Sequence, residues 1–150
     1  MGDNALEKVL LMMGCPEVPV QTSIVLYLAN RIGRSGRRVV IAGTDAALKL
    51  LRVSDPEGYY VKEIVDLDRC IEDIVEERTD FDRCFIFMHS DAGATYGATM
   101  SAISRAKLYA VIFGKNAETL AESLEFPCEK VVAKAVHNPM PLKNRLDRVI

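Results

Sequence analysis

The sequence lacks the common nucleotide-binding and hydrolase motifs. No Gly-x-Gly-x-x-Gly follows the first apolar segment, and Gly114-Lys115-Asn116 has neither the glycines nor the Lys-Ser/Thr pair of a P-loop. No Gly-x-Ser-x-Gly nucleophile elbow occurs either. These absences disfavour a dinucleotide-dependent dehydrogenase, a P-loop NTPase and an α/β-hydrolase, and no motif identifies a cofactor.

Metal-binding and disulfide patterns are also missing. The cysteines are Cys15, Cys70, Cys84 and Cys128. They are widely spaced and form no Cys-x-x-Cys pair, and the 2 histidines do not have zinc-finger spacing. We therefore expect reduced thiols, a packing role for the last three cysteines, and no metal site.

The chain has neither a large charge of one sign nor a long apolar run. Its formal net charge of -2 gives no general attraction to nucleic acid or to anionic lipid. The most apolar stretch, residues 18–32, is interrupted by polar side chains and is too short to span a membrane. No secretory signal opens the chain. We expect a cytoplasmic protein that has no nucleic-acid or membrane partner.

Length and composition fit one globular domain over residues 1–150. A chain of 150 residues with 49% hydrophobic and 27% charged residues can bury a core without disulfides or metals. Short apolar runs alternate with segments of helical periodicity. Five runs predict strands at residues 8–13, 38–42, 84–88, 108–113 and 130–136, and a weaker sixth lies at 61–65.

The helical segments between these strands have apolar residues at helical spacing. The first has Val20, Ile24, Leu28 and Ile32, and the third has Leu67, Ile71, Ile74 and Val75. Thr44, Asp66 and Asn116 are expected helix caps. The last helix is predicted to begin at Pro139 or Pro141 and to bury Leu142, Leu146 and Val149. Arg31, Arg34, Arg37 and Arg38 are read as a solvated cluster near the carboxyl end of the first helix.

Alternation of buried strands and helices predicts a three-layer α/β/α domain with a mostly parallel sheet of five or six strands, of the Rossmann or flavodoxin kind. Ligands of such sheets bind beyond the carboxyl ends of the strands, where the strand order reverses. The loops at this edge contain Gly14-Cys15-Pro16, His89-Ser90-Asp91 and His137-Asn138. If the weak strand is peripheral, the strands before Cys15 and His89 are neighbours, and these two residues face one crevice.

The segment from His89 to Tyr96 is the most informative, because it follows a very apolar strand and opens a helix. The amino end of that helix offers free amides to an anion, and small residues such as Gly93 let a ligand approach the backbone. A structural reading is also open, since small residues let any helix pack closely on a sheet. The candidate ligand-binding residues are Gly14, Cys15, Pro16, His89, Ser90, Asp91, Gly93, Tyr96, His137 and Asn138.

Cys15 and His89 are also candidate catalytic residues. Cys15 lies before a helix whose dipole would lower the pKa of the thiol, whereas the charge of Glu17 would oppose this effect. His89 would then act as the base. A metal site from both histidines with Cys15 and Asp91 would require the loops to converge, and their spacing does not require it.

Several short pieces resemble a small family of uncharacterised proteins from methanogenic archaea, known as a domain of unknown function. They are Gly14-Cys15-Pro16-Glu17 with Pro19-Val20-Gln21, Asp55-Pro56-Glu57-Gly58 with Tyr60, Val65-Asp66-Leu67 with Cys70-Ile71, Asp91-Ala92 with Tyr96, and His137-Asn138-Pro139 with Pro141-Leu142. The resemblance implies a three-layer α/β/α fold and an archaeal cytoplasmic setting. It implies no activity, so the cofactor is unknown.

Three functions fit these observations. The leading hypothesis is a binding or accessory protein that holds a small anionic metabolite or cofactor at the carboxyl edge of the sheet. The second is an enzyme with Cys15 as nucleophile or sulfur carrier and His89 as base. The third is a structural subunit that docks a protein partner or forms a homo-oligomer.

Overall fold

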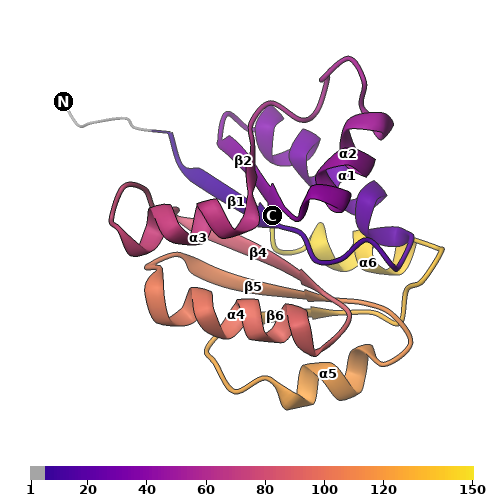
Figure 1. The fold of residues 1–150 in the computed structure, drawn as a ribbon. Coiled ribbons are helices and arrows are strands. Elements are labelled where there is room, and N and C mark those ends of the chain that lie inside the picture. The colour runs from indigo at the N-terminus through magenta and orange to yellow at the C-terminus, as the bar shows by residue number, and fades with distance from the viewer. Residues whose placement is uncertain (1–5) are drawn as a thin grey trace.

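The computed structural model describes residues 6–150, in which six strands alternate with six helices (Figure 1). The strands are β1 (Lys8–Met12), β2 (Arg38–Gly43), β3 (Ile64–Asp66), β4 (Arg83–Met88), β5 (Lys107–Ile112) and β6 (Glu129–Val132). The helices are α1 (Val20–Arg34), α2 (Asp45–Ser54), α3 (Leu67–Val75), α4 (Asp91–Ile103), α5 (Ala117–Ser123) and α6 (Met140–Leu146).

The six strands form one parallel sheet in the order β3-β2-β1-β4-β5-β6. β1 pairs with β2 on one side and with β4 on the other, so the strand order reverses between β1 and β4. This is the Rossmann order and not the flavodoxin order. The predicted fold class is confirmed, and the weak strand predicted at residues 61–65 corresponds to the edge strand β3, which begins only at Ile64.

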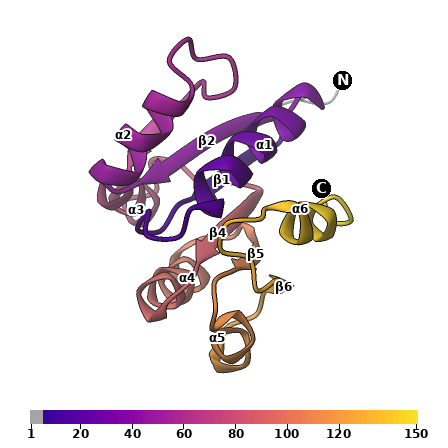
Figure 2. The ribbon, with the colours of Figure 1, turned by 90° about the vertical axis from the view of Figure 1, so that its right-hand side faces the viewer.

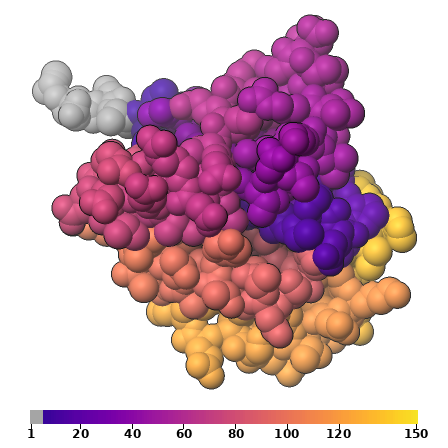
Figure 3. Space-filling view, viewed as in Figure 1, coloured from indigo at the N-terminus to yellow at the C-terminus, as the bar shows by residue number. Residues whose placement is uncertain are grey.

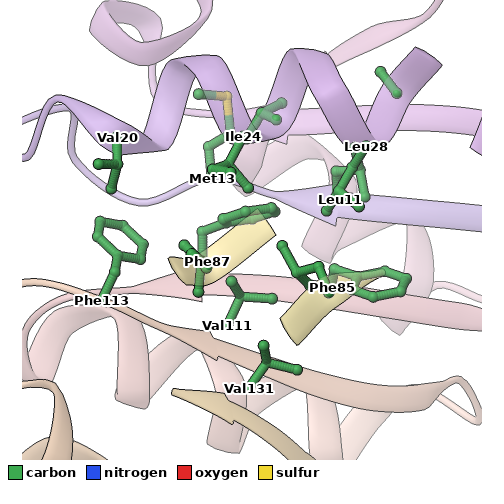
Figure 4. Close-up of a cluster of buried hydrophobic side chains, with 14 of the residues drawn as sticks. Leu11, Met13, Val20, Ile24, Leu28, Phe85, Phe87, Val111, Phe113 and Val131 are labelled. Carbon is green, nitrogen blue, oxygen red and sulfur yellow. The ribbon is translucent and has the colours of Figure 1, made fainter. Parts of the chain in front are cut away.

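Helices cover both faces of the sheet (Figure 2). Apolar residues of α1, α2 and α6 pack on one face, and those of α3, α4 and α5 pack on the other. Along β1, Val9 and Leu11 belong to the first core, whereas Leu10 and Met12 belong to the second. Burial of alternate side chains on opposite faces explains why the central strands are continuously apolar. Figure 4 shows the first core between α1 and the sheet.

Most predicted helix faces agree with the structure, with one correction in α3. All four apolar positions predicted for the first helix are buried. In α3, Leu67 and Ile74 are buried, but Val75 is 55% exposed. The core-facing residues of α3 are spaced three and four apart from Leu67 through Cys70 to Ile74, so Val75 lies one position beyond that face.

The carboxyl-terminal segment also differs from the prediction. β6 ends at Val132 and not at residue 136, because the Ala135 N–H turns back to the carbonyl of Ala133, although the Ala135 carbonyl still accepts the N–H of Gly114. The last helix begins after Pro139 and buries Leu142 and Leu146 as expected. Val149 lies beyond that helix and is only partly buried.

The expected helix caps are confirmed for two of the three residues. The side chains of Thr44 and Asp66 accept N–H groups from the first turns of α2 and α3. Asn116 occupies the cap position of α5, but its side chain makes no capping bond. Across residues 6–150, no helix is both long and apolar enough to cross a lipid bilayer.

Candidate functional site

A pocket of about 220 Å³ lies beyond the carboxyl ends of β1 and β4, at the point where the strand order reverses. Its lining residues are Met13, Gly14, Cys15, Thr44, Leu67, Phe87, Met88, His89, Ser90, Ala92, Gly93 and Tyr96. We call it the switch-point pocket. In doubly wound sheets this is the usual position of a ligand.

The loop after β1 is fixed by a buried glutamine. Gln21 in α1 is fully buried. Its Oε1 accepts the N–H of Gly14 at 2.9 Å, and its Nε2 donates to the carbonyl of Gly14 at 3.0 Å. The loop therefore keeps a defined position beside α4. In Figure 3 the surface of this segment, in indigo, adjoins the salmon surface around the start of α4.

His89 connects the two loops at the switch point. Its Nε2–H donates to the carbonyl oxygen of Cys15 at 3.0 Å. Its ring packs at a tilt on Phe113, with 5.6 Å between the ring centroids. His89 is therefore held from both sides, and it forms one wall of the pocket.

The amino end of α4 borders the pocket with free hydrogen-bond donors. Ser90 is the N-cap residue, and its side chain makes no capping bond. The first bonded amide of the helix is that of Ala94, which donates to the carbonyl of Ser90 at 3.3 Å. Within residues 6–150, the N–H groups of Asp91, Ala92 and Gly93 have no acceptor. Such a helix end attracts an anion or a hydrogen-bond acceptor.

The start of α1, by contrast, is occupied by the protein itself. Pro19 stands at its N-cap and has no N–H. The Val20 N–H donates to the carbonyl of Val136 at 3.0 Å, and the Gln21 N–H donates to Val18 at 3.2 Å. In dinucleotide-binding proteins the pyrophosphate lies at the start of this helix. Here these amides are already bonded, so the free helix end at the switch point is that of α4.

The Cys15 thiol is exposed and is not activated by its neighbours. Its Sγ lies 3.6 Å from a carboxylate oxygen of Glu17. Partial burial, the charge of Glu17 and the hydrogen bond to that carboxylate raise the pKa of the thiol. The Nε2 of His89 bonds to the backbone carbonyl of Cys15 and not to its sulfur. In this geometry His89 is not in contact with the thiol as a base.

The structure brings together six of the ten residues that the sequence suggests for ligand binding. Those in the switch-point pocket are Gly14, Cys15, His89, Ser90, Gly93 and Tyr96. Pro16, Asp91, His137 and Asn138 do not line it. Asp91 borders a separate surface hollow beside Phe126. The side chain of Asn138 accepts the N–H of Met140 at the start of α6, and His137 is exposed.

Six further lining residues are not among the candidates drawn from sequence. They are Met13, Thr44, Leu67, Phe87, Met88 and Ala92. Four of them are large apolar residues that extend strands or begin a helix, and their sequence pattern indicates only core packing. Thr44 is expected as a helix cap, which it is, and it also borders the pocket.

This edge of the sheet has no cluster of potential metal ligands in the part of the chain that the structure describes. Among residues 6–150, no three His, Cys, Asp or Glu side chains lie close enough to bind one ion. In particular, Asp91 and His137 lie outside the pocket that Cys15 and His89 share. The polar groups of the lining residues include the α4 amides, the hydroxyls of Ser90, Thr44 and Tyr96, the thiol of Cys15 and the imidazole of His89.

Known proteins match nearly the whole chain. The uncharacterised protein MJ0452 of Methanocaldococcus jannaschii is 37% identical over 149 residues, which are 95% of this chain and 96% of that protein. The solved structure of MT0777 matches with a TM-score of 0.86 and 38% identity, over 95% of each chain. The family model described as "Domain of unknown function (DUF1890)" matches residues 10–149. The chain therefore belongs to this family, one known in methanogenic archaea.

Proposed function

We propose that the protein is a cytoplasmic binding or accessory protein that holds a small metabolite, or one end of a cofactor, in the switch-point pocket. The observation that carries the proposal is the free amino end of α4, which borders a pocket at the reversal of strand order. The ligand would place a carboxylate or phosphate at the N–H groups of Ala92 and Gly93. Hydrogen bonds to an anion are stronger than those between neutral groups.

The lining of the pocket indicates the rest of the ligand. Side chains of Met13, Leu67 and Phe87 supply apolar surface, and Tyr96 adds an aromatic ring at the same pocket. A volume of about 220 Å³ is below the range of about 300–1,000 Å³ for drug-sized ligands. The pocket therefore suits a small metabolite with an apolar part, or one end of a larger cofactor.

A thermal-shift screen with a blocking variant tests the proposal. Purified protein is screened against carboxylates, phosphosugars, nucleotides, flavins, pterins, corrinoids and coenzyme A species. A ligand at about 100 times its dissociation constant adds about 2.7 kcal/mol. For a chain of this size we expect a rise in Tm of about 5–10 °C. Ala92→Leu places a larger side chain at the mouth of the pocket, so the rise should disappear.

The matched control is Ala102→Leu. Ala102 is an exposed alanine of the same helix and does not line the pocket, so this variant should keep the rise in Tm. If no compound stabilises the parent more than Ala92→Leu, the proposal is wrong. A ligand that stabilises both variants equally binds elsewhere and also contradicts it.

Asp91 provides a test of the ligand's charge. Its carboxylate is in the first turn of α4 and repels an anion at the neighbouring amides. Asp91→Asn should therefore tighten the binding of an anionic ligand by about two- to fivefold. A neutral ligand would show no such change, and that result would refute the anionic part of the proposal.

A further inference from the structure

A second groove, of about 410 Å³, lies at the opposite edge of the sheet, where β2 begins. We call it the amino-edge groove. It lies between the carboxyl end of α1 and residues 59–63. Its lining residues are Leu6, Ala29, Asn30, Gly33, Arg34, Arg37, Arg38, Val39, Tyr59, Tyr60, Lys62 and Glu63. Neither the switch-point pocket nor its proposed function involves these residues.

Two of the cationic side chains at the groove form no direct ion pair in the described residues. Arg38 forms a two-pronged ion pair with Glu63, with N–O distances of 2.6 and 2.7 Å. Arg34 has no carboxylate oxygen within 4.0 Å in residues 6–150, and Lys62 donates only to a backbone carbonyl, at 2.7 Å. Within residues 6–150, Arg34 and Lys62 thus line the groove without a direct ion pair, although the whole chain has a net charge of -2. An anion complements this surface.

Two tyrosines stand on the other side of the groove. Tyr59 is 72% exposed and Tyr60 is 46% exposed. Their backbone is fixed, because the buried carboxylate of Asp55 accepts the N–H groups of Tyr59, Tyr60 and Val61 at 2.9 to 3.0 Å. Aromatic rings held on a fixed backbone lose little entropy when a flat ligand stacks on them.

We propose that the amino-edge groove binds an anion that carries an aromatic ring, such as a nucleoside monophosphate or an aryl phosphate. The phosphate would bind between Arg34 and Lys62, and the ring would stack on Tyr59 or Tyr60. Guanidinium groups match the oxygens of a phosphate in pairs, and aromatic side chains stack on flat rings. The groove volume lies within the usual range of ligand pockets, about 300–1,000 Å³.

Gly33 allows the groove to be blocked without disturbing the fold. A Cβ atom at Gly33 would have no heavy atom within 4 Å apart from its own helix and neighbours, and the residue lies in α1. Gly33→Met therefore extends a side chain into the groove, whereas Gly33→Ala adds only a methyl group. Both variants should fold, which far-UV circular dichroism and urea unfolding would check.

The probes are adenosine 5′-monophosphate and phenyl phosphate. Inorganic phosphate and adenosine, the two parts of adenosine 5′-monophosphate, are measured for comparison. Dissociation constants are measured by NMR titration at low salt for the full chain. We expect both probes to bind at least about tenfold more tightly than inorganic phosphate, since base–aromatic stacking adds to the ionic contact. Gly33→Met should abolish this binding, and Gly33→Ala should retain it.

Charge and ring are then tested separately. Arg34→Ala should weaken the binding of both probes about tenfold. Arg52→Ala makes the same change in charge at an exposed site on α2 outside the groove, and it should change their dissociation constants less than about twofold. The double variant Tyr59→Ala/Tyr60→Ala should weaken the binding of both probes at least about fivefold, and Tyr59→Phe/Tyr60→Phe should retain their binding.

Several results would overturn the proposal. The proposal is wrong if neither probe shows saturable binding, or if Gly33→Met leaves the binding unchanged. It is also wrong if Arg34→Ala and Arg52→Ala lose the same amount of affinity. Binding that Ala92→Leu abolishes and Gly33→Met spares would place the probes in the switch-point pocket instead. In that case the amino-edge groove is not their site.

Discussion

Gly93 is the third residue of α4, and it lies where the helix presses against the end of β4. A Cβ atom added at Gly93 would lie 2.4 Å from the Cβ and 2.9 Å from the Cα of Met88. Both atoms belong to the rigid part of a central strand, so neither can rotate away. Gly93→Ala should therefore push the amino end of α4 off the sheet.

The cost follows from two opposing terms. Carbon atoms pack best at about 3.5–4.0 Å, so the helix must shift by about 1 Å. Overpacking of this kind costs about 1–3 kcal/mol, and contact with fixed atoms favours the upper part of that range. Replacing glycine by alanine in a helix returns up to about 1 kcal/mol. We expect a net loss of about 2 kcal/mol in the free energy of unfolding, or about 4–8 °C in Tm.

Two other glycines serve as matched controls. At Gly97 the added Cβ would meet the ring of Phe126 at 2.4 Å, but this ring is only partly buried and can move. Gly97→Ala should therefore cost less than about 1 kcal/mol net. At Gly33 there is open space, so Gly33→Ala should stabilise the protein by up to about 1 kcal/mol.

Equilibrium urea unfolding of the parent and the three variants measures these differences, provided that the slope of free energy against urea concentration is unchanged. Gly93→Ala should also weaken the binding of any ligand in the switch-point pocket, because it displaces the free amides of α4. The steric reasoning is refuted if Gly93→Ala is as stable as the parent, or if Gly97→Ala costs more.

Three further changes test the supports of the two sites. Gln21→Ala leaves the N–H and C=O of Gly14 unbonded and should cost about 2–4 kcal/mol in urea unfolding, whereas a loss below about 1 kcal/mol would show that water replaces the amide. Burial would raise the pKa of the Asp55 carboxyl, but its three backbone N–H donors and the charge of Lys62 lower that pKa below its usual value. Asp55→Asn should therefore cost about 2–3 kcal/mol at neutral pH, and the difference from the parent should shrink as the pH falls below about 4; a constant difference would contradict this. Burial and Glu17 raise the pKa of the Cys15 thiol, so the rate of its alkylation by iodoacetamide should rise with pH to a midpoint above that of a cysteine peptide. Glu17→Gln should lower this pH midpoint. An unchanged midpoint would count against the contact between the Glu17 carboxylate and the thiol.

The sequence predicts the sheet and its edge well because the strands are buried on both faces. Continuous apolar runs identify β1, β2, β4 and β5 almost to the residue. The edge strand β3 is short and more polar, since within residues 6–150 it pairs with β2 alone. The end of β6 could not be predicted, because the Ala135 N–H turns back to the Ala133 carbonyl although the Ala135 carbonyl still accepts the Gly114 N–H, and no residue pattern marks this change.

The candidate site is predictable as far as its loops are concerned. Glycine, histidine and serine after β1 and β4 mark the switch point, and the pairing of these strands brings Cys15 and His89 to one pocket. Apolar residues that line the pocket, such as Leu67 and Phe87, cannot be distinguished from core residues by their sequence pattern alone. The role of Gln21 is also hidden, because a glutamine within a helix is usually exposed.

The two proposed sites differ in how they would attract an anion, and this difference follows from the distribution of charge. At the switch-point pocket the attraction comes from the amides of α4, while Asp91 adds a carboxylate in the same turn. At the amino-edge groove it comes from the full charges of Arg34 and Lys62. Salt weakens the attraction between solvent-exposed charges, whereas interactions inside a partly buried pocket are screened much less. Affinity at the amino-edge groove should therefore fall steeply with added salt, and affinity at the switch-point pocket should change little. Equal salt dependence at both sites would mean that α4 binds its ligand through long-range charge and not through direct amide contacts.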